Sequence, residues 1–164
     1  MEVHLRTTIA QFYFQLGADY STYAFVPHLA IALWDAACQS ACVTESRSHI
    51  AACFLLAQKM IDVSVSDIDE LCDAFGVLDA TDIFQSEMHL LQSKTIDRAD
   101  AHPHLEFVEC MSTEAAQPQH VKKNAGRYFN LTVFFHGISQ KVRAQAAVHA
   151  AIYHDAQYVE HASP

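Results

Sequence analysis

The chain has 164 residues, of which 51% are hydrophobic and 18% charged, and a formal net charge of -9. This composition excludes a disordered chain, because it supplies enough apolar side chains for a sizeable core and too little charge to remain unfolded. Ten Lys and Arg residues against nineteen Asp and Glu argue against a nucleic-acid or anionic-membrane partner. No apolar run approaches the ~20 residues needed to span a bilayer.

Helix breakers are scarce, with four Gly and four Pro residues, which favours an all-α fold. Apolar residues recur at helical spacing and predict helices in chain order. The predicted ranges are 3–17, 25–40, 46–62, a helix from 64 or 66 to 75, a helix from 80 or 82 to 93, 104–111, 119–135 and 139–157. Two local signals mark helix ends, namely Gly17 as a C-cap and a capping box formed by Ser66 and Asp69.

The third predicted helix is the most apolar segment of the chain. Every residue from Ile50 to Ala57 is apolar, so this helix is expected to be central and buried nearly all round. In the fifth predicted helix, the spacing assigns an inward face to four residues: Ile83, Phe84, Met88 and Leu91.

One acidic residue lies within that inward face. Glu87 falls among its apolar side chains, where a carboxylate is costly unless it is paired or lies at the rim. Lys59 closes the third helix and lies off its apolar stripe. If the third and fifth helices pack as neighbours, the two side chains meet at one rim. The alternative is a lysine and a glutamate that are solvated separately.

Enzymatic and metal sites find no support in the residue pattern. His149 and His154 are five residues apart, whereas two ligands on one helical face are four apart. The sequence has no glycine-rich phosphate loop and no serine in the turn context of a nucleophile. We therefore expect no metal, no cofactor and no enzymatic activity.

The cysteines indicate a compartment. The chain has five, an odd number, and four lie among apolar residues in or next to predicted helices: Cys38, Cys42, Cys53 and Cys72. Such residues are typical of buried thiols in a reducing environment. We expect a nuclear or cytoplasmic protein.

Several segments resemble the cyclin box. The helix ending Ala57-Gln58-Lys59, with a glutamate 28 residues later, is similar to the third and fifth helices of that family. Four residues fall on the Met, Arg, Leu and Trp of its first helix: Leu5, Arg6, Ile9 and Phe12. Asp35, in HLAIALWDAACQS, falls on the aspartate of its second helix. LLAQKM and PHLEFVECM are most similar to D-type and viral D-type cyclins, and VRAQAAVHAAIYHD resembles a helix of a second box.

The resemblance implies a fold and a partner. It implies a five-helix cyclin box over residues 1–111, a linker over 112–118 and a truncated second cyclin box over 119–164, which we expect to pack back on the first. The function implied is binding and allosteric activation of a cyclin-dependent protein kinase. Five residues fall on kinase-binding positions of the family: Lys59 and Glu87 as polar anchors, and Met60, Leu91 and Ile96 as apolar contacts.

A second family site is less well matched. Leu5, Ile9, Phe12 and Gln15 fall on the patch that binds Arg-x-Leu substrates. Thr8 replaces an isoleucine of that patch, so we expect weak binding or none.

Two alternatives remain open at this point. The short segment before the first helix and the truncated second box favour a cyclin-fold adaptor or decoy that binds a kinase or another protein without activating it. A cyclin fold used in transcription initiation is the other alternative, and the acidic charge argues against direct DNA contact there.

Overall fold

The computed structural model describes residues 3–20, 25–39, 46–61, 65–93, 107, 109–111, 117–132 and 138–162. Every regular element in these ranges is an α-helix, so the predicted all-α fold class is confirmed. The chain divides into two compact units, Met1–Ala101 and His102–Pro164. The predicted division into a box, a linker and a partial second box stays a prediction, because packing alone does not define family boundaries.

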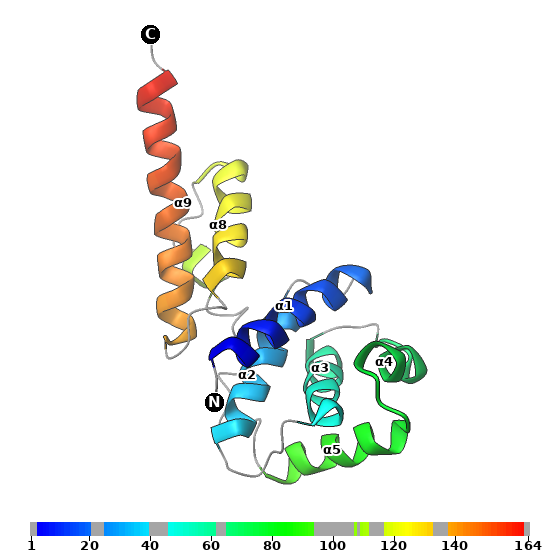
Figure 1. The fold of residues 1–164 in the computed structure, drawn as a ribbon. Coiled ribbons are helices and arrows are strands. Elements are labelled where there is room, and N and C mark those ends of the chain that lie inside the picture. The colour runs from blue at the N-terminus through cyan, green and yellow to red at the C-terminus, as the bar shows by residue number, and fades with distance from the viewer. Residues whose placement is uncertain are drawn as a thin grey trace. The chain divides into compact units, whose positions relative to one another are not determined.

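The helices follow the predicted order (Figure 1). Their bounds are α1 Val3–Asp19, α2 Val26–Gln39, α3 Arg47–Ile61, α4 Ile68–Phe75, α5 Ala80–Gln92, α8 Gln119–Thr132 and α9 Gln140–Ala162. Residues 107 and 109–111 of the predicted 104–111 helix are helical, and its other positions lie outside the described residues. No helix in the described part of the chain is both long and apolar enough to cross a membrane.

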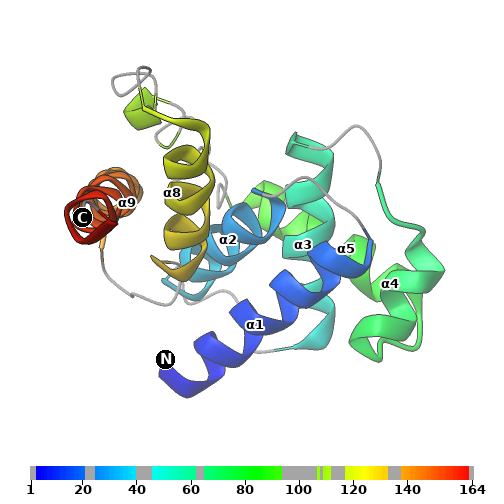
Figure 2. The same cartoon turned by 90° about the horizontal axis from the view of Figure 1, so that it is seen from above.

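The core of the first unit is built around α2 and α3. The predicted central helix α3 is buried continuously from Ala51 to Gln58, and α2 is buried from Val26 to Trp34. Helix α5 runs across α3 in both views (Figures 1 and 2). Buried apolar side chains in continuous runs are typical of helices surrounded by other helices, and they give α3 a fixed position from which to hold α5.

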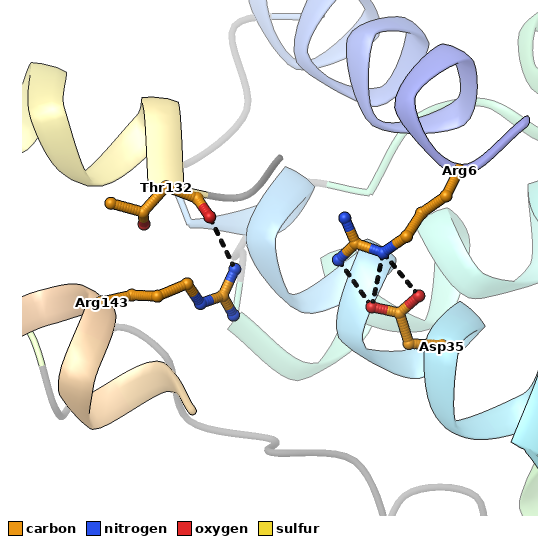
Figure 3. Close-up of polar contacts among 4 residues, drawn as sticks. All are labelled: Arg6, Asp35, Thr132 and Arg143. Carbon is orange, nitrogen blue, oxygen red and sulfur yellow. Dashed lines mark hydrogen bonds and ion pairs between the residues drawn. The ribbon is translucent and has the colours of Figure 1, made fainter. Parts of the chain in front are cut away.

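Helix α1 is fixed by one ion pair and one aromatic cluster. Arg6 donates hydrogen bonds from Nε and Nη2 to the carboxylate of Asp35 on α2, at 2.7–3.0 Å (Figure 3). The fully buried Tyr13 donates its hydroxyl to the carbonyl of Ile50, at 2.8 Å, and stacks on Phe54. These contacts satisfy the buried polar groups that α1 carries into the core.

Two predicted helix ends were wrong. Helix α1 does not stop at Gly17 but continues to Asp19. The N-cap of α4 is Asp67, whose side chain accepts a hydrogen bond from the backbone N–H of Asp69 at 2.8 Å. Ser66 does not cap, because its hydroxyl is bound by the side chain of Gln58 at 2.7 Å.

The end of α4 agrees with the prediction. Gly76 adopts φ 62°, a left-handed conformation that closes the helix and that favours glycine. A Cβ at this position would lie 2.7 Å from Nη1 of Arg47, the far end of a flexible side chain that can move aside, so it is the backbone conformation that favours glycine here.

The second unit contains an antiparallel pair of helices, α8 and α9 (Figure 1). Val121, Ala125 and Phe129 form the buried face of α8, and small residues such as Ala144 and Ala147 are buried on α9. Small side chains let two helices approach closely. Arg143 donates from Nη1 to the carbonyl of Thr132 at 3.4 Å, which ties the start of α9 to the end of α8 (Figure 3).

Candidate functional site

The structure brings together the two polar residues that the sequence singles out. Nζ of Lys59, in the last turn of α3, lies 2.7 Å from Oε1 and 2.8 Å from Oε2 of Glu87 on α5. The lysine side chain is 41% exposed and the glutamate side chain 10% exposed. The pair therefore lies at the surface on its cationic side and in the interior on its anionic side.

The face of α5 that packs inward differs from the predicted one. The buried positions are Ile83, Ser86, Glu87 and Leu90. Of the four residues predicted to face inward, only Ile83 does. The ion pair explains the difference, because a carboxylate that accepts two hydrogen bonds from an ammonium group can be buried at low cost.

The rotation of α5 about its own axis that buries Glu87 leaves a strip of apolar side chains exposed. The α5 strip consists of Phe84, Met88 and Leu91, which are 44%, 53% and 42% exposed. These residues are spaced four and three apart and so lie on one helical face. Three large apolar side chains on one exposed face are typical of a surface that binds another protein.

The strip adjoins the ion pair. Nζ of Lys59 lies 6.0 Å from the ring centroid of Phe84, and the next residue, Met60, is 37% exposed. The site thus combines a polar centre that is already paired with apolar side chains beside it. Central polar groups with an apolar surround are common at the energetic centres of protein interfaces.

A buried amide supports the end of α3. Gln58, which is fully buried, donates from Nε2 to Oγ of Ser66 at 2.7 Å, and its Oε1 accepts from the backbone N–H of Ser66 at 3.4 Å. Because Gln58 directly precedes Lys59, this double contact limits movement of the last turn of α3, from which Lys59 extends.

Two of the family's three apolar contact positions can be placed in the structure. Met60 and Leu91 are exposed beside the ion pair. Ile96 lies outside the described residues. Sequence reasoning missed Phe84 and Met88 as surface residues, although their spacing with Leu91 was available as a signal.

The four residues matched to the substrate-docking patch are not equally accessible. Ile9 is buried, whereas Leu5 and Phe12 are half-buried and Gln15 is exposed. The ring of Phe12 packs edge-on against Phe75 of α4, with centroids 5.0 Å apart. The amide of Gln15 binds the carboxylate of Asp19 at 2.9 Å, so the exposed side of this patch is largely polar.

None of the described cysteines forms a disulfide with another described residue. Cys53 and Cys72 are buried, Cys38 is half-buried, and Cys42 lies outside the described residues. Burial raises the pKa of the Cys53 thiol strongly. A thiol in this state is a poor nucleophile and a poor metal ligand. No group of three or more His, Cys, Asp or Glu side chains within the described ranges is arranged to hold a metal ion.

Neither the protein-family models nor the curated proteins include a match to this chain. The surface formed by α3 and α5 is the feature of the described residues that points to a function.

Proposed function

We propose that this chain is a cyclin-like regulatory subunit that binds and allosterically activates a cyclin-dependent protein kinase. The observation that carries the proposal is the ion pair of Lys59 and Glu87 beside the exposed α5 strip. The cyclin resemblance of the sequence, in which these two residues fall on the kinase-binding positions, supplies the identity of the partner.

The ion pair retains hydrogen-bonding capacity for a partner. An ammonium group has three N–H donors, and Lys59 directs two short contacts to one carboxylate. The carboxylate of Glu87 has about four lone-pair sites, so it can accept further hydrogen bonds. A partner helix or loop that presents backbone groups can therefore bind both side chains without breaking the pair.

The apolar strip supplies the second part of the binding energy. Covering Phe84, Met88 and Leu91 removes exposed apolar surface from water at about 25 cal/mol per Å². Because α5 packs on the buried α3, the backbone that carries the strip is already in position before the partner arrives. Rigid contact surfaces lose less conformational entropy on binding.

Activation requires that the surface prefers one kinase state. A ligand shifts an equilibrium between two conformations by the difference between its affinities for them. In the proposed complex, the α3–α5 surface binds the kinase's regulatory helix in its active orientation, which completes the kinase's own catalytic lysine–glutamate pair. This chain supplies no catalytic group.

The test uses a double variant, Lys59→Ala with Glu87→Ala. We expect the purified variant to retain its helical content but to bind the kinase tens- to thousands-fold more weakly, because loss of a desolvated polar contact costs about 2–5 kcal/mol. The matched control removes one exposed lysine and one exposed glutamate elsewhere, Lys123→Ala with Glu70→Ala.

Two measurements separate the outcomes. Co-purification from cells with tagged parent and variant chains reports binding, and phosphorylation of a peptide substrate reports activation. Kinase binding without increased phosphorylation would favour the adaptor or decoy instead. Equal binding by the parent and the double variant would place the interface elsewhere.

A further inference from the structure

Two histidines face each other where α5 crosses α3. Nε2 of His49, in the first turns of α3, lies 3.4 Å from Nδ1 of His89 on α5. The ring centroids are 5.7 Å apart, and the rings are perpendicular at 88°. The distance between the two ring centroids exceeds the distance between the two facing nitrogens by about the sum of the ring radii. Both nitrogens therefore lie near the line that joins the centroids, and each points at the other.

This head-on geometry fits one shared proton and no metal ion. A tetrahedral zinc ion lies off the line between two ligand nitrogens, at the point where both lone pairs converge, whereas these two nitrogens are directed at each other. A neutral imidazole carries a hydrogen on one of its two nitrogens. With one hydrogen between them, one ring donates and the other accepts.

The other nitrogen of His49 is also engaged. Its Nδ1 lies 2.7 Å from Oγ of Ser46 and 3.4 Å from Oγ of Ser86 on α5. Oγ of Ser48 lies 3.1 Å from both serine oxygens, and Ser86 also donates to the carbonyl of Asp82 at 2.8 Å. The ring of His49 is therefore fixed in orientation, with Nε2 directed at His89.

A second proton changes the contact from attraction to repulsion. When both rings are protonated, both facing nitrogens carry a hydrogen, and two positive charges oppose each other. Burial lowers the pKa of His49 below its usual value, and the charge of His89 lowers it further. The stability that the histidine pair contributes is therefore fully present above the ordinary histidine pKa of about 6.5. It is lost as the pH falls from there toward the lowered pKa of His49.

Other titratable groups on the elements around α3 have contacts of their own, and His28 of α2 is fully buried with its ring edge-on to Phe14. On α2, the carboxylate of Asp35 is bound by Arg6. Cys38, also on α2, contributes to the raised pKa of Cys53. On α5, Glu87 is bound by Lys59.

The acidic residues of α4 influence the pKa values of two groups outside the histidine pair, Tyr20 and Cys72. Glu70 and Asp73 affect the pKa of Tyr20, and Asp69 and Asp73 affect that of Cys72. Asp82 of α5 contributes to the histidine cluster through its backbone carbonyl.

We propose that the His49–His89 pair is a proton-operated switch that loosens the crossing of α5 over α3 below neutral pH and so weakens binding at the α5 strip. The pair lies near the start of α3 and the Lys59–Glu87 pair near its end, so polar contacts hold α5 at both ends of α3. His89 follows Met88 of the strip directly. The effect on binding rests on the proposed function, whereas the loosening is a property of the free chain.

The first test measures thermal unfolding of the full chain by circular dichroism. The parent, His89→Asn and the control His4→Gln are compared at about pH 7.5 and about pH 5.5, on either side of the ordinary histidine pKa. Asparagine places a neutral amide where Nδ1 of His89 lies and cannot take up a proton. We expect the Tm of the parent and of His4→Gln to fall about 2–4 °C more than that of His89→Asn. An equal fall in all three would overturn the switch.

The second test needs no variant that must fold. The ring protons of His49 and His89 in the parent are followed by NMR as the pH is lowered. We expect the ring protons of His49 to titrate below the ordinary histidine pKa of about 6.5, because burial and the neighbouring ring of His89 lower the pKa of His49. Titration of His49 at the ordinary histidine pKa would overturn the proposal.

The third test concerns the partner. Affinity for the co-purified kinase is measured at the same two pH values, and we expect roughly tenfold weaker binding by the parent at the lower one and a smaller change for His89→Asn. Equal weakening of both chains would overturn the link to binding. If neither chain binds the kinase at either pH, the proposed function fails, and the melting and NMR experiments still decide the switch.

Discussion

Two carboxylates in the first unit are each bound by a cation at 2.7 Å, yet the two pairs have different surroundings. In the pair of Arg6 and Asp35, the arginine is 5% exposed and the aspartate 20%. In the pair of Lys59 and Glu87, the lysine is 41% exposed and the glutamate 10%. The nitrogen–oxygen distance is therefore the same in both pairs, although the cation is buried in the first pair and reaches the surface in the second.

The choice of cation matches the difference. The guanidinium of Arg6 binds both oxygens of Asp35 through Nε and Nη2, which uses its planar fork for a fixed geometry between α1 and α2. The ammonium of Lys59 is a point charge on a flexible stem and lies beside exposed apolar side chains. We infer that the first pair specifies the fold, and that the second is placed for recognition.

The largest expected effect is the loss of folding stability caused by Asp35→Ala. Removing the carboxylate takes away the partner of a buried guanidinium, which costs about 3–5 kcal/mol of the free energy of unfolding. Urea denaturation followed by circular dichroism measures the loss. Asp73→Ala, at an exposed position of α4, is the matched control and should change stability by less than about 0.5 kcal/mol. A loss below about 1 kcal/mol for Asp35→Ala would show that the two pairs are not energetically different.

A smaller effect, on affinity alone, is expected from Phe84→Ser with Met88→Ser. These side chains are exposed, so stability should change little, whereas truncating central interface residues typically costs about 2 kcal/mol or more of binding free energy. Binding of the kinase by calorimetry gives the affinity, and urea denaturation gives the stability. Leu78→Ser, at an exposed loop position, is the control. Unchanged affinity would remove the α5 strip from the interface.

The smallest effect on the stability of the free chain is expected from removing both members of the second pair, in Lys59→Ala with Glu87→Ala, because no buried charge is then left unpaired. An ion pair with an exposed cation contributes about 0–1 kcal/mol, and salt screens it. Urea denaturation at low and high salt measures this contribution. A loss as large as that of Asp35→Ala would mean that the Lys59–Glu87 pair also holds the fold together.

The sequence predicted the helices and their order because apolar spacing is a local property. It also predicted that α3 is central, since Ile50–Ala57 contains no polar side chain. It failed on the inner face of α5, where hydropathy pointed to Phe84, Met88 and Leu91. Polar residues occupy that face because their partners on α3 satisfy them, and such partners lie far away in the sequence.

Pairings between distant helices were only partly accessible from the sequence. Lys59 and Glu87 were expected to meet if their helices were neighbours, and they do. The contact of Arg6 with Asp35 was not anticipated, although both residues were matched to family positions. The histidine pair was also missed, because 40 residues separate its members and no spacing rule joins positions so far apart.

The burial of Trp34 gives the protein a built-in optical reporter. It is the one tryptophan in the sequence, its ring is fully buried on α2, and no described residue accepts a hydrogen bond from its Nε1. An indole in such apolar surroundings emits at short wavelength and shifts to the red when water reaches it. Its emission therefore reports on the surroundings of α2 in the first unit, whereas circular dichroism follows the helices of both units. The difference between the two melting curves measures whether the units unfold together.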